Sequence, residues 1–409
     1  MGNAVIVDAV RTAGGKRNGK LSGWHPADLA AECLKALQER NNLDPALVED
    51  VIMGCVMQVG AQGLNVGRNA VLAAGWPESV PSTTIDRQCG SSQQAAHFAA
   101  QAVMSGAHDI VVAAGVEVMS LVWMGASVMV DGVGAPFGPS VGMRYMDQEQ
   151  YPGHKGLVGQ GISAEIIADK WGLSREDLDA FGLQSQERAA IATAEGRFAN
   201  EIIPVTEKRV EIDPTTRKPT GKVIESGEMV TKDEGLRDTT MEILANLKPA
   251  FTPEGKVTAA NSSQITDGAS AMLIMSEEKA KELGLKPRAR FHTFALAGVD
   301  PIEMLTGPIP ATRKVLEKSG LTIEDIDLVE INEAFASVVL SWEKEIKPDM
   351  SKVNVNGGAI ALGHPLGCSG TKLMATLLNE LERTGGRYGL QTMCEGGGMA
   401  NATIIERLD

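Results

Sequence analysis

One pattern of helices and strands occurs twice in this chain of 409 residues, and it restricts the possible folds more than any other feature. Residues 43–54 begin with Leu-Asp-Pro, continue through a helical turn and end in the strand Val-Ile-Met-Gly. Residues 321–331 repeat this order roughly 277 positions later. In both copies a turn with Ser and Gly, a helix and another apolar strand follow. A duplicated α/β unit is therefore predicted.

The strands of both copies are apolar without strict alternation. Such strands, separated by helices, are typical of mixed sheets that helices cover on both faces. Two halves packed face to face would bring positions 89 and 364 to equivalent ends of their elements, where open α/β sheets place their sites. Strands are expected at residues 4–10, 51–59, 109–114, 328–331 and 388–393, and helices at 26–39, 92–105 and 371–383.

Residues 121–245 interrupt this pattern and are expected to form an inserted loop domain. This stretch is rich in Met and Gly at first, then helical and charged, and then hairpin-like. The N-terminal half is expected at 1–120, completed by 246–278, and the C-terminal half at 279–409. Between residues 205 and 237 seven acidic residues are balanced by seven basic ones, and this balance fits a solvated face or an anion site. The basic residues are Lys208, Arg209, Arg217, Lys218, Lys222, Lys232 and Arg237.

Charge and cysteine usage exclude several classes of protein. The net charge of -14 argues against non-specific binding to nucleic acid or anionic membranes, because no basic excess can release counterions. No segment approaches the ~18 uninterrupted apolar residues of a membrane span. The five cysteines are odd in number and lack Cys-x-x-Cys spacing, so they indicate neither a disulfide framework nor a zinc site. We expect a cytoplasmic protein without a targeting segment.

Cys89 directly precedes an Ala-rich run that predicts a buried helix ending at Gly106. A thiol at the first turn of a helix faces unpaired N–H groups and the positive end of the helix dipole, and both favour the nucleophilic thiolate. This stretch alone leaves a second interpretation open, since most free cysteines are simply buried apolar residues. Cys33 and Cys368 have no comparable setting and are expected in the core.

Two further segments have the composition of a reactive site. His364 lies between glycines and before a proline, which favours a shaped loop, although a lone histidine can also be a satisfied core residue. Cys394 precedes three glycines whose amides can form either an oxyanion hole or a plain turn.

Together these segments resemble the thiolase family of acyltransferases. The resemblance spans the chain, and residues 86–95 are most similar to thiolases of bacterial lipid and sterol breakdown. It implies a thiolase-like α/β fold of two duplicated halves plus a loop domain. It also implies cleavage of a 3-ketoacyl-CoA by CoA to acetyl-CoA and a shortened acyl-CoA, or the reverse condensation, through an acyl-cysteine. The motifs are Cys89 before its helix, Asn261-Ser262-Ser263, Asp267-Gly268-Ala269, Asn332-Glu333-Ala334-Phe335, residues 354–358 running into Gly363-His364-Pro365, and Cys394-x-Gly-Gly-Gly.

The same resemblance implies the roles of the reactive residues. Cys89 would be the acylated nucleophile, His364 its base, and Cys394 the acid and base at the acetyl Cα. Asn332, through a water molecule, would join His364 in a hole for the enolate oxygen. The backbone amides of Cys89 and Gly396 would form a second hole.

Four residues are expected to contact CoA, again by resemblance. Ser263 corresponds to the contact with the pantetheine arm, Phe251 and Phe335 to the tunnel around that arm, and Arg237 to a contact with the nucleotide. CoA is a substrate, so no cofactor or metal is expected. The expected partners are acyl-CoA, CoA and further copies of the chain in a homodimer or homotetramer.

The chain departs from the family pattern at two places. Gly159-Gln160 stands where many biosynthetic relatives carry His-Met, which predicts a wider or differently polar acyl pocket and puts acetoacetyl-CoA specificity in doubt. Gln264 replaces a frequent glycine after the pantetheine serine.

Four other functions compete with a degradative thiolase. The first is a biosynthetic acetyltransferase that forms acetoacetyl-CoA. A cysteine thioesterase would use Cys89, His364 and Asn332 but has no need of Cys394. A non-catalytic acyl-CoA or lipid carrier would need none of the reactive side chains. A decarboxylating condensing enzyme would be expected to carry a second histidine where this chain has Asn332.

Overall fold

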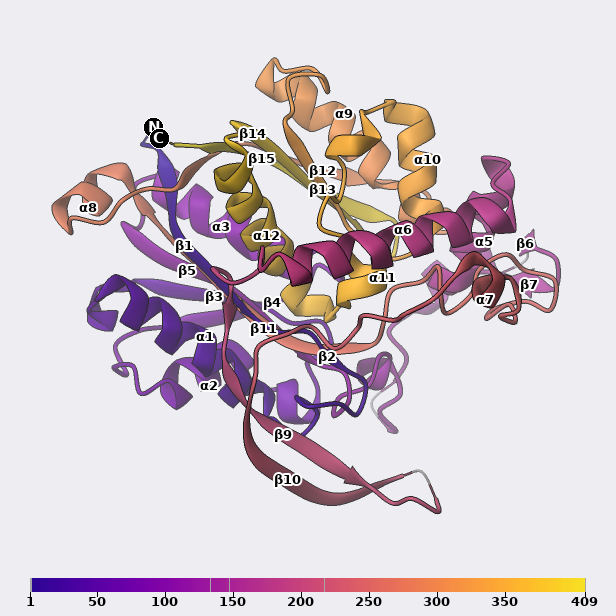
Figure 1. Ribbon diagram of the computed structural model, residues 1–409, viewed down its shortest axis with the longest axis horizontal. Coiled ribbons are helices and arrows are strands. Elements are labelled where there is room, and N and C mark those ends of the chain that lie inside the picture. Colours follow the sequence, from indigo (N-terminus) through magenta and orange to yellow (C-terminus); the bar gives the residue numbers. More distant parts are fainter. Residues whose placement is uncertain (1, 133, 147, 217, 409) are drawn as a thin grey trace.

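The computed structural model describes residues 2–132, 134–146, 148–216 and 218–408. Arg217, one of the basic residues counted above, lies outside the described residues. Strands of both halves, together with the short β8 from the segment between them, form one mixed sheet of 11 strands (Figure 1). Its central path runs β13-β14-β15-β12-β1-β11-β5-β3-β4. The strands are β1 (Ala4–Thr12), β2 (Gly15–Lys16), β3 (Asp50–Gly54), β4 (Ser82–Ile85), β5 (Ile110–Val118), β8 (Ile202–Ile203), β11 (Thr266–Ser276), β12 (Ala289–Gly298), β13 (Leu328–Ile331), β14 (Tyr388–Glu395) and β15 (Met399–Arg407).

The strand order contains the duplication that the sequence predicts. In the N-terminal half β3 is parallel to β5, β5 is antiparallel to β11, and β11 is antiparallel to β1. In the C-terminal half β13, β14, β15 and β12 repeat these three relations in the same order. The expected α/β class with mixed sheets is confirmed.

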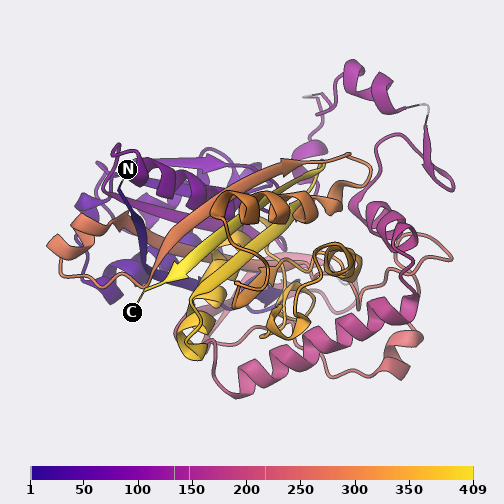
Figure 2. The same ribbon diagram turned by 90° about the horizontal axis from the view of Figure 1, so that it is seen from above.

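The two halves meet in two ways. Helices α3 (Ser91–Met104) and α12 (Ser369–Thr384) pack against each other, which fits the expected packing of the halves. The equivalent strands β1 and β12 also pair edge to edge, with Val5 opposite Arg290 and Ile6 opposite Ala289. This second junction makes one continuous sheet of the two halves (Figure 2), and the repeat alone did not predict it.

Small side chains allow the central helices to approach so closely. Ala95, Ala96, Ala99 and Ala100 of α3 are fully buried, and they belong to one apolar cluster with the large side chains of α12. Burying a leucine contributes about 1.5–3 kcal/mol, so the facing leucines stabilise the junction of the halves. Gly106 takes the left-handed conformation (φ 76°) after α3, as expected for a helix stop.

The segment between β5 and β11 contains helices and two small hairpins. Its first part extends from the body of the molecule (Figure 2), and β9 and β10 form a protruding antiparallel hairpin (Figure 1). Helix α6 packs on α10 and α11 of the C-terminal half. The elements are α4 (Pro139–Tyr145), β6 (Glu149–Tyr151), β7 (His154–Lys155), α5 (Gln160–Lys170), α6 (Arg175–Ala194), β9 (Val205–Ile212), β10 (Pro219–Val230) and α7 (Met241–Ala245).

The remaining helices cover the sheet or shape loops. Among the described residues, none of the helices has the length and apolar character needed to cross a membrane. The α-helices are α1 (Pro26–Asn41), α2 (Val66–Ala73), α8 (Glu277–Glu282), α9 (Pro308–Ser319), α10 (Ala336–Ile346) and α11 (Ala359–Leu362). The short 3₁₀ helices are Pro45–Leu47, Gly60–Gln62, Ala126–Val128, Met304–Thr306, Met350–Lys352 and Leu366–Cys368.

Candidate active site

Cys89 lies in a tight turn directly before α3. Gln88 takes a left-handed backbone conformation (φ 47°), and its N–H donates to the Asp86 carboxylate over 2.6 Å. Gly90 is the N-cap of the helix, and any side chain there would collide with the carboxyl group of Glu395. Cys89 itself is only 3% exposed. The turn therefore holds the thiol at the start of the helix but inside the protein.

Burial decides the resting protonation state of Cys89. It raises the pKa of the thiol to about 12, although hydrogen bonds from the Gln160 side chain and from the backbone amides of Gly396 and Cys89 oppose the rise. The backbone N–H groups thus favour the thiolate as expected, but removal of water outweighs them in the resting protein. Cys89 rests as a thiol and needs a base to become a nucleophile.

His364 is a buried, neutral imidazole with a defined proton position. Burial and the charge of Lys372 lower its pKa to about 3. The Ser369 hydroxyl donates to the carbonyl oxygen of Pro365 and lies 2.5 Å from His364 Nδ1. Since that hydroxyl has a single proton, Nδ1–H donates to Ser369 Oγ and Nε2 carries no proton, so that its lone pair faces the Asn332 amide. A neutral imidazole with an unprotonated Nε2 can accept a proton from a thiol.

Asn332 and His364, which the sequence motifs pair, lie together. The side-chain nitrogen of Asn332 is 3.4 Å from His364 Nε2, and both residues are buried. The other polar atom of this amide, Oδ1, is buried without a hydrogen-bond partner among the described residues. An unsatisfied amide beside an imidazole can hold a polar substrate atom or a water molecule.

Cys394 and Cys89 also lie within electrostatic range of each other. Cys394 stands near the end of β14 and is fully buried. Burial raises the pKa of its thiol well above the ordinary value, and the charge of a Cys89 thiolate raises it further. Gly397 and Gly398 turn into β15 with left-handed φ angles of 82° and 83°. Two thiols in such proximity can perform successive steps on one substrate.

A cavity of about 590 Å³ contains two of the expected CoA contacts, Arg237 and Ser263. It also contains two cations that the sequence did not single out, Lys16 and Arg17. The backbone N–H of Ser263 donates to the carbonyl oxygen of Ala334, which ties this cavity to the Asn332 segment. The lining consists of Lys16, Arg17, Glu234, Gly235, Leu236, Arg237, Ala259, Ser263, Gln264 and Ile265.

The two expected aromatic residues lie edge to face. The ring centroids of Phe251 and Phe335 are 5.9 Å apart at an interplanar angle of 71°. A side chain at Gly161 would overlap the Phe251 ring, so a glycine is required there. Gln264, the second departure from the family pattern, donates to the backbone carbonyls of Gly235 and Ile360. The glutamine therefore links the wall of the cavity to α11.

An apolar cavity of about 560 Å³ adjoins the glycine turn after Cys394. Gly397 forms one part of its wall, and the 3₁₀ helix at Met304 forms another. Most of the remaining lining comes from residues 137–158, within the expected loop domain. The complete lining is Phe137, Ser140, Val141, Arg144, Tyr145, Leu157, Val158, Pro301, Met304 and Gly397.

Glu117 holds the His364 loop in place, and sequence reasoning missed it. Its buried carboxylate accepts hydrogen bonds from the backbone N–H groups of Val56, Met57 and Gly367 and from the Gln62 side chain. These bonds connect the end of β3 to the loop that follows His364. The available signal was an acidic residue inside the otherwise apolar run of residues 110–119.

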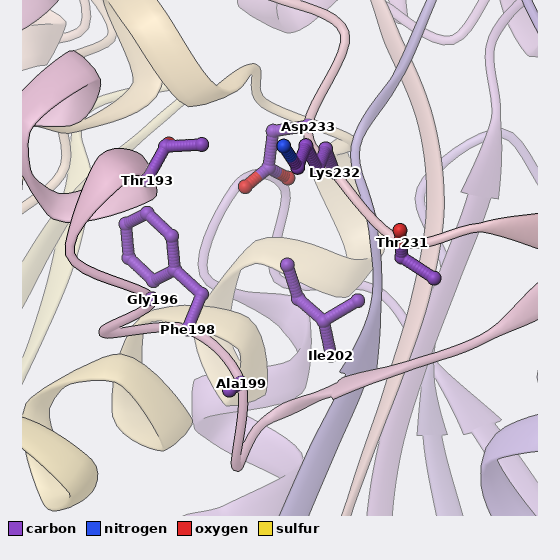
Figure 3. Close-up of a pocket in the computed structure, with 8 residues that line it drawn as sticks. All are labelled: Thr193, Gly196, Phe198, Ala199, Ile202, Thr231, Lys232 and Asp233. Carbon is purple, nitrogen blue, oxygen red and sulfur yellow. The ribbon is translucent and has the colours of Figure 1, made fainter.

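A further cavity of about 320 Å³ lies beside the end of α6 and contains none of the predicted site residues (Figure 3). Its Asp233 carboxylate is fixed by two hydrogen bonds from Arg11. Among the described residues, His, Cys, Asp and Glu side chains form no group suited to a metal ion.

Two domain models of one known protein family match nearly the whole chain. The profile of the thiolase N-terminal domain matches residues 4–278, and that of the thiolase C-terminal domain matches residues 285–407. The chain belongs to the thiolase family. The resemblance drawn from the sequence motifs is confirmed, and so are the acyltransferase class and the fold.

Individual relatives of this thiolase cover its whole length. It is 52% identical to the steroid 3-ketoacyl-CoA thiolase FadA6 of Mycobacterium tuberculosis, over 100% of this chain and 95% of that protein. It is 43% identical to a 3-ketoacyl-CoA thiolase of Bacillus subtilis, over 99% and 100%. The crystal structure of the Bacillus anthracis acetyl-CoA acetyltransferase matches with a TM-score of 0.86 at 40% identity, over 100% and 99%.

Proposed function

We propose that this thiolase degrades 3-ketoacyl-CoA substrates with bulky acyl groups, transferring the shortened acyl group to CoA. One observation carries the proposal: two buried thiols, Cys89 and Cys394, lie within electrostatic range of each other. Carbon–carbon bond cleavage needs a nucleophile and a separate acid for the leaving carbanion, and two thiols can supply both. Steady-state thiolysis of 3-ketoacyl-CoAs from acetoacetyl-CoA to steroid side chains tests it.

In the first half of the reaction Cys89 becomes acylated. His364 Nε2 accepts the thiol proton, and the sulfur forms a bond to the C3 carbonyl carbon. The C2–C3 bond then breaks, and its electron pair becomes the enolate of acetyl-CoA. Asn332 and the protonated His364 hold the enolate oxygen, and Cys394 donates a proton to the carbon.

In the second half CoA removes the acyl group from Cys89. The CoA thiol loses its proton to the Cys394 thiolate and attacks the thioester carbonyl, whose oxygen is held by the amides of Cys89 and Gly396. Donors of this kind contribute about 2.7–4 kcal/mol where they have been removed from other enzymes. Collapse of the intermediate releases the shortened acyl-CoA and returns the Cys89 sulfur, which regains its proton from His364.

The cationic cavity is our proposed site for CoA. Lys16, Arg17 and Arg237 stand at its wall, where phosphates would find positive charge in an otherwise acidic chain. Ser263 would contact the pantetheine arm, with Phe251 and Phe335 along it. The proposed loop domain, residues 121–245, contributes Arg237 to this cavity and most of the wall of the apolar one.

Arg237→Ala should raise the KM for CoA severalfold and change kcat little, because a phosphate contact is shared by ground and transition states. The increase should shrink at high salt, since exposed charges are screened over about 8–10 Å at ~0.1–0.15 M ionic strength. Initial rates at several salt concentrations measure both effects. Arg313→Ala, which removes a surface arginine paired with Glu345, is the matched control. An unchanged KM in Arg237→Ala would exclude this contact.

The apolar cavity is our proposed site for the acyl group. Its volume of about 560 Å³ exceeds what an acetyl group needs. A bulky acyl group there would lie beside Gly397, in the glycine turn that follows Cys394. This supports a degradative function over the biosynthetic formation of acetoacetyl-CoA.

Gly159→His should penalise bulky 3-ketoacyl-CoAs about tenfold more than acetoacetyl-CoA, a difference of about 1.4 kcal/mol. A Cβ at Gly159 meets no atom within 4 Å, so the substitution is tolerated, and the imidazole would narrow the approach beside Val158. The ratio of kcat/KM for the two substrates is the measurement. Gln148→His, at an exposed position of the same segment, serves as control. Equal slowing of both substrates would mean that this loop does not select the acyl group.

We further propose that the protein acts in the cytoplasm as a homodimer or homotetramer. All five cysteines are free and buried, as is typical of a reducing compartment. Leu121, Trp123 and Met124 are 46%, 50% and 52% exposed, and contact with another copy would cover such apolar side chains.

A further inference from the structure

The side-chain amide of Gln160 lies against the sulfur of Cys89. Gln160 is the first residue of α5, and its Nε2 donates to Cys89 Sγ over 3.9 Å. The same nitrogen would be 3.3 Å from a Cβ built on Gly396. The amide therefore reaches both the sulfur and Gly396, whose backbone N–H is also hydrogen-bonded to that sulfur.

Beyond Gln160, the backbone amides of Gly396 and Cys89 and the charge of Glu395, the sulfur packs against apolar side chains. Cys89 packs in one cluster with buried aliphatic and thioether side chains from both halves of the chain. A thiolate in such a place has little water to solvate it, so each hydrogen-bond donor matters more than it would at the surface. The other buried members of the cluster are Val56, Met57, Met119, Val122, Leu366, Leu373 and Met393.

We propose that Gln160 is a catalytic hydrogen-bond donor, which stabilises the thiolate of Cys89 and then the oxygen that becomes charged when this sulfur adds to the substrate carbonyl. The inference rests on the function proposed above. The thiol proton passes to His364 Nε2, the sulfur electron pair forms the new bond to carbon, and the carbonyl π electrons move to oxygen. Gln160 keeps both of its amide protons throughout.

The position of the amide suits both stages. A carbonyl oxygen held by the N–H of Gly396 must lie close to that residue, and Gln160 Nε2 is already there. The departure from the family pattern at this position thus supplies polarity at the nucleophile, in addition to any change in the width of the pocket. A side chain that only filled space would alter the selection of acyl groups without changing the reactivity of the free thiol.

The test measures the reactivity of Cys89 in the full-length protein without substrate. Iodoacetamide is the probe, and mass spectrometry quantifies alkylation of the Cys89 peptide between about pH 6 and pH 10, because the thiolate is the reactive form. Gln160→Met keeps an unbranched side chain without a donor. Gln160→Glu keeps the shape and replaces the donor with a negative charge. Gln148→Met is the matched control on an exposed glutamine.

In Gln160→Met, alkylation of Cys89 at neutral pH should be about tenfold slower than in the native protein, the effect of one hydrogen bond to a charged acceptor. The pH profile should move upward, and kcat should fall by a similar factor while the KM for CoA stays constant. Gln160→Glu should be slower still, and Gln148→Met should match the native protein.

Native rates and an unchanged pH profile in Gln160→Met would overturn the proposal, even if bulky substrates bound differently. If that variant fails to fold, Gln160→Glu decides, and alkylation as fast as in the native protein would overturn it. Preferential labelling of Cys33 or Cys368 in the native protein would instead contradict the function proposed for Cys89. That result needs no variant of Gln160, so the two failures can be told apart.

Discussion

Cys89→Ser should reduce turnover by at least about a thousandfold, because an unactivated hydroxyl replaces the only group proposed to form the acyl-enzyme. The structure makes the loss severe. Burial already holds the pKa of the thiol at about 12, and a serine hydroxyl is much harder to deprotonate. The neutral His364, whose pKa burial lowers to about 3, is too weak a base to overcome that difference.

Mass spectrometry of the native protein after reaction with a 3-ketoacyl-CoA should show an acyl adduct on Cys89. Cys33→Ala and Cys368→Ala are suitable controls, since both thiols are buried, and the Cys368 thiol donates to the Ser270 hydroxyl. These variants should keep the adduct and most of the activity. An adduct on Cys33 or Cys368 would show that the nucleophile has been misassigned.

Cys394→Ala should lower thiolysis and condensation about 10²–10⁴-fold, the usual contribution of a general acid or base. The physical reason is that the acetyl Cα then has no proton donor or acceptor, while the acylation of Cys89 by an acyl-CoA keeps its own base. Exchange of the acetyl Cα proton in deuterated water should stop. The Cys89 adduct should still form.

This separation of steps also discriminates between the candidate functions. A thioesterase of the same fold would hydrolyse acyl-CoA equally well with and without Cys394, because hydrolysis needs one thiol only. Undiminished proton exchange in Cys394→Ala would remove Cys394 from its proposed role. Thermal unfolding should be compared, because the removed thiol is fully buried and truncation can leave a small cavity.

Most of the fold could be predicted from the sequence, because the patterns that indicate its helices and strands are local and occur in both halves. The expected strand at residues 328–331 coincides with β13, and the helix expected at 371–383 lies within α12. The helix from Ser91 to Met104 was evident from its alanines. β11 and β12 were not predicted as strands. Both are central to the sheet, but their positions depend on pairing with β1, far away in the chain.

Residues of the candidate site could be predicted where a sequence motif marks them. Side chains that reach the site from a distant segment of the chain could not. Cys89, His364 and Cys394 stand in segments of unusual composition. Lys16 and Arg17 face the proposed CoA cavity only because the chain folds back beside Arg237. Gln160 was noticed as a departure, but its contact with the nucleophile could not be read from residue order. The resting protonation of Cys89 could not be predicted, because burial is a property of the whole fold.

The place of β1 in the sheet has a consequence for biosynthesis. During translation it emerges before the other strands of its sheet, yet its long neighbours β11 and β12 begin only at residues 266 and 289. Until then only the two-residue strand β8 can pair with it, and an apolar strand with largely open edges invites pairing with other chains. The half that carries Cys89 therefore cannot fold as the ribosome delivers it. A nascent chain of this enzyme depends on protection, by chaperones or by its own transient helices, until more than half of its sequence has been made.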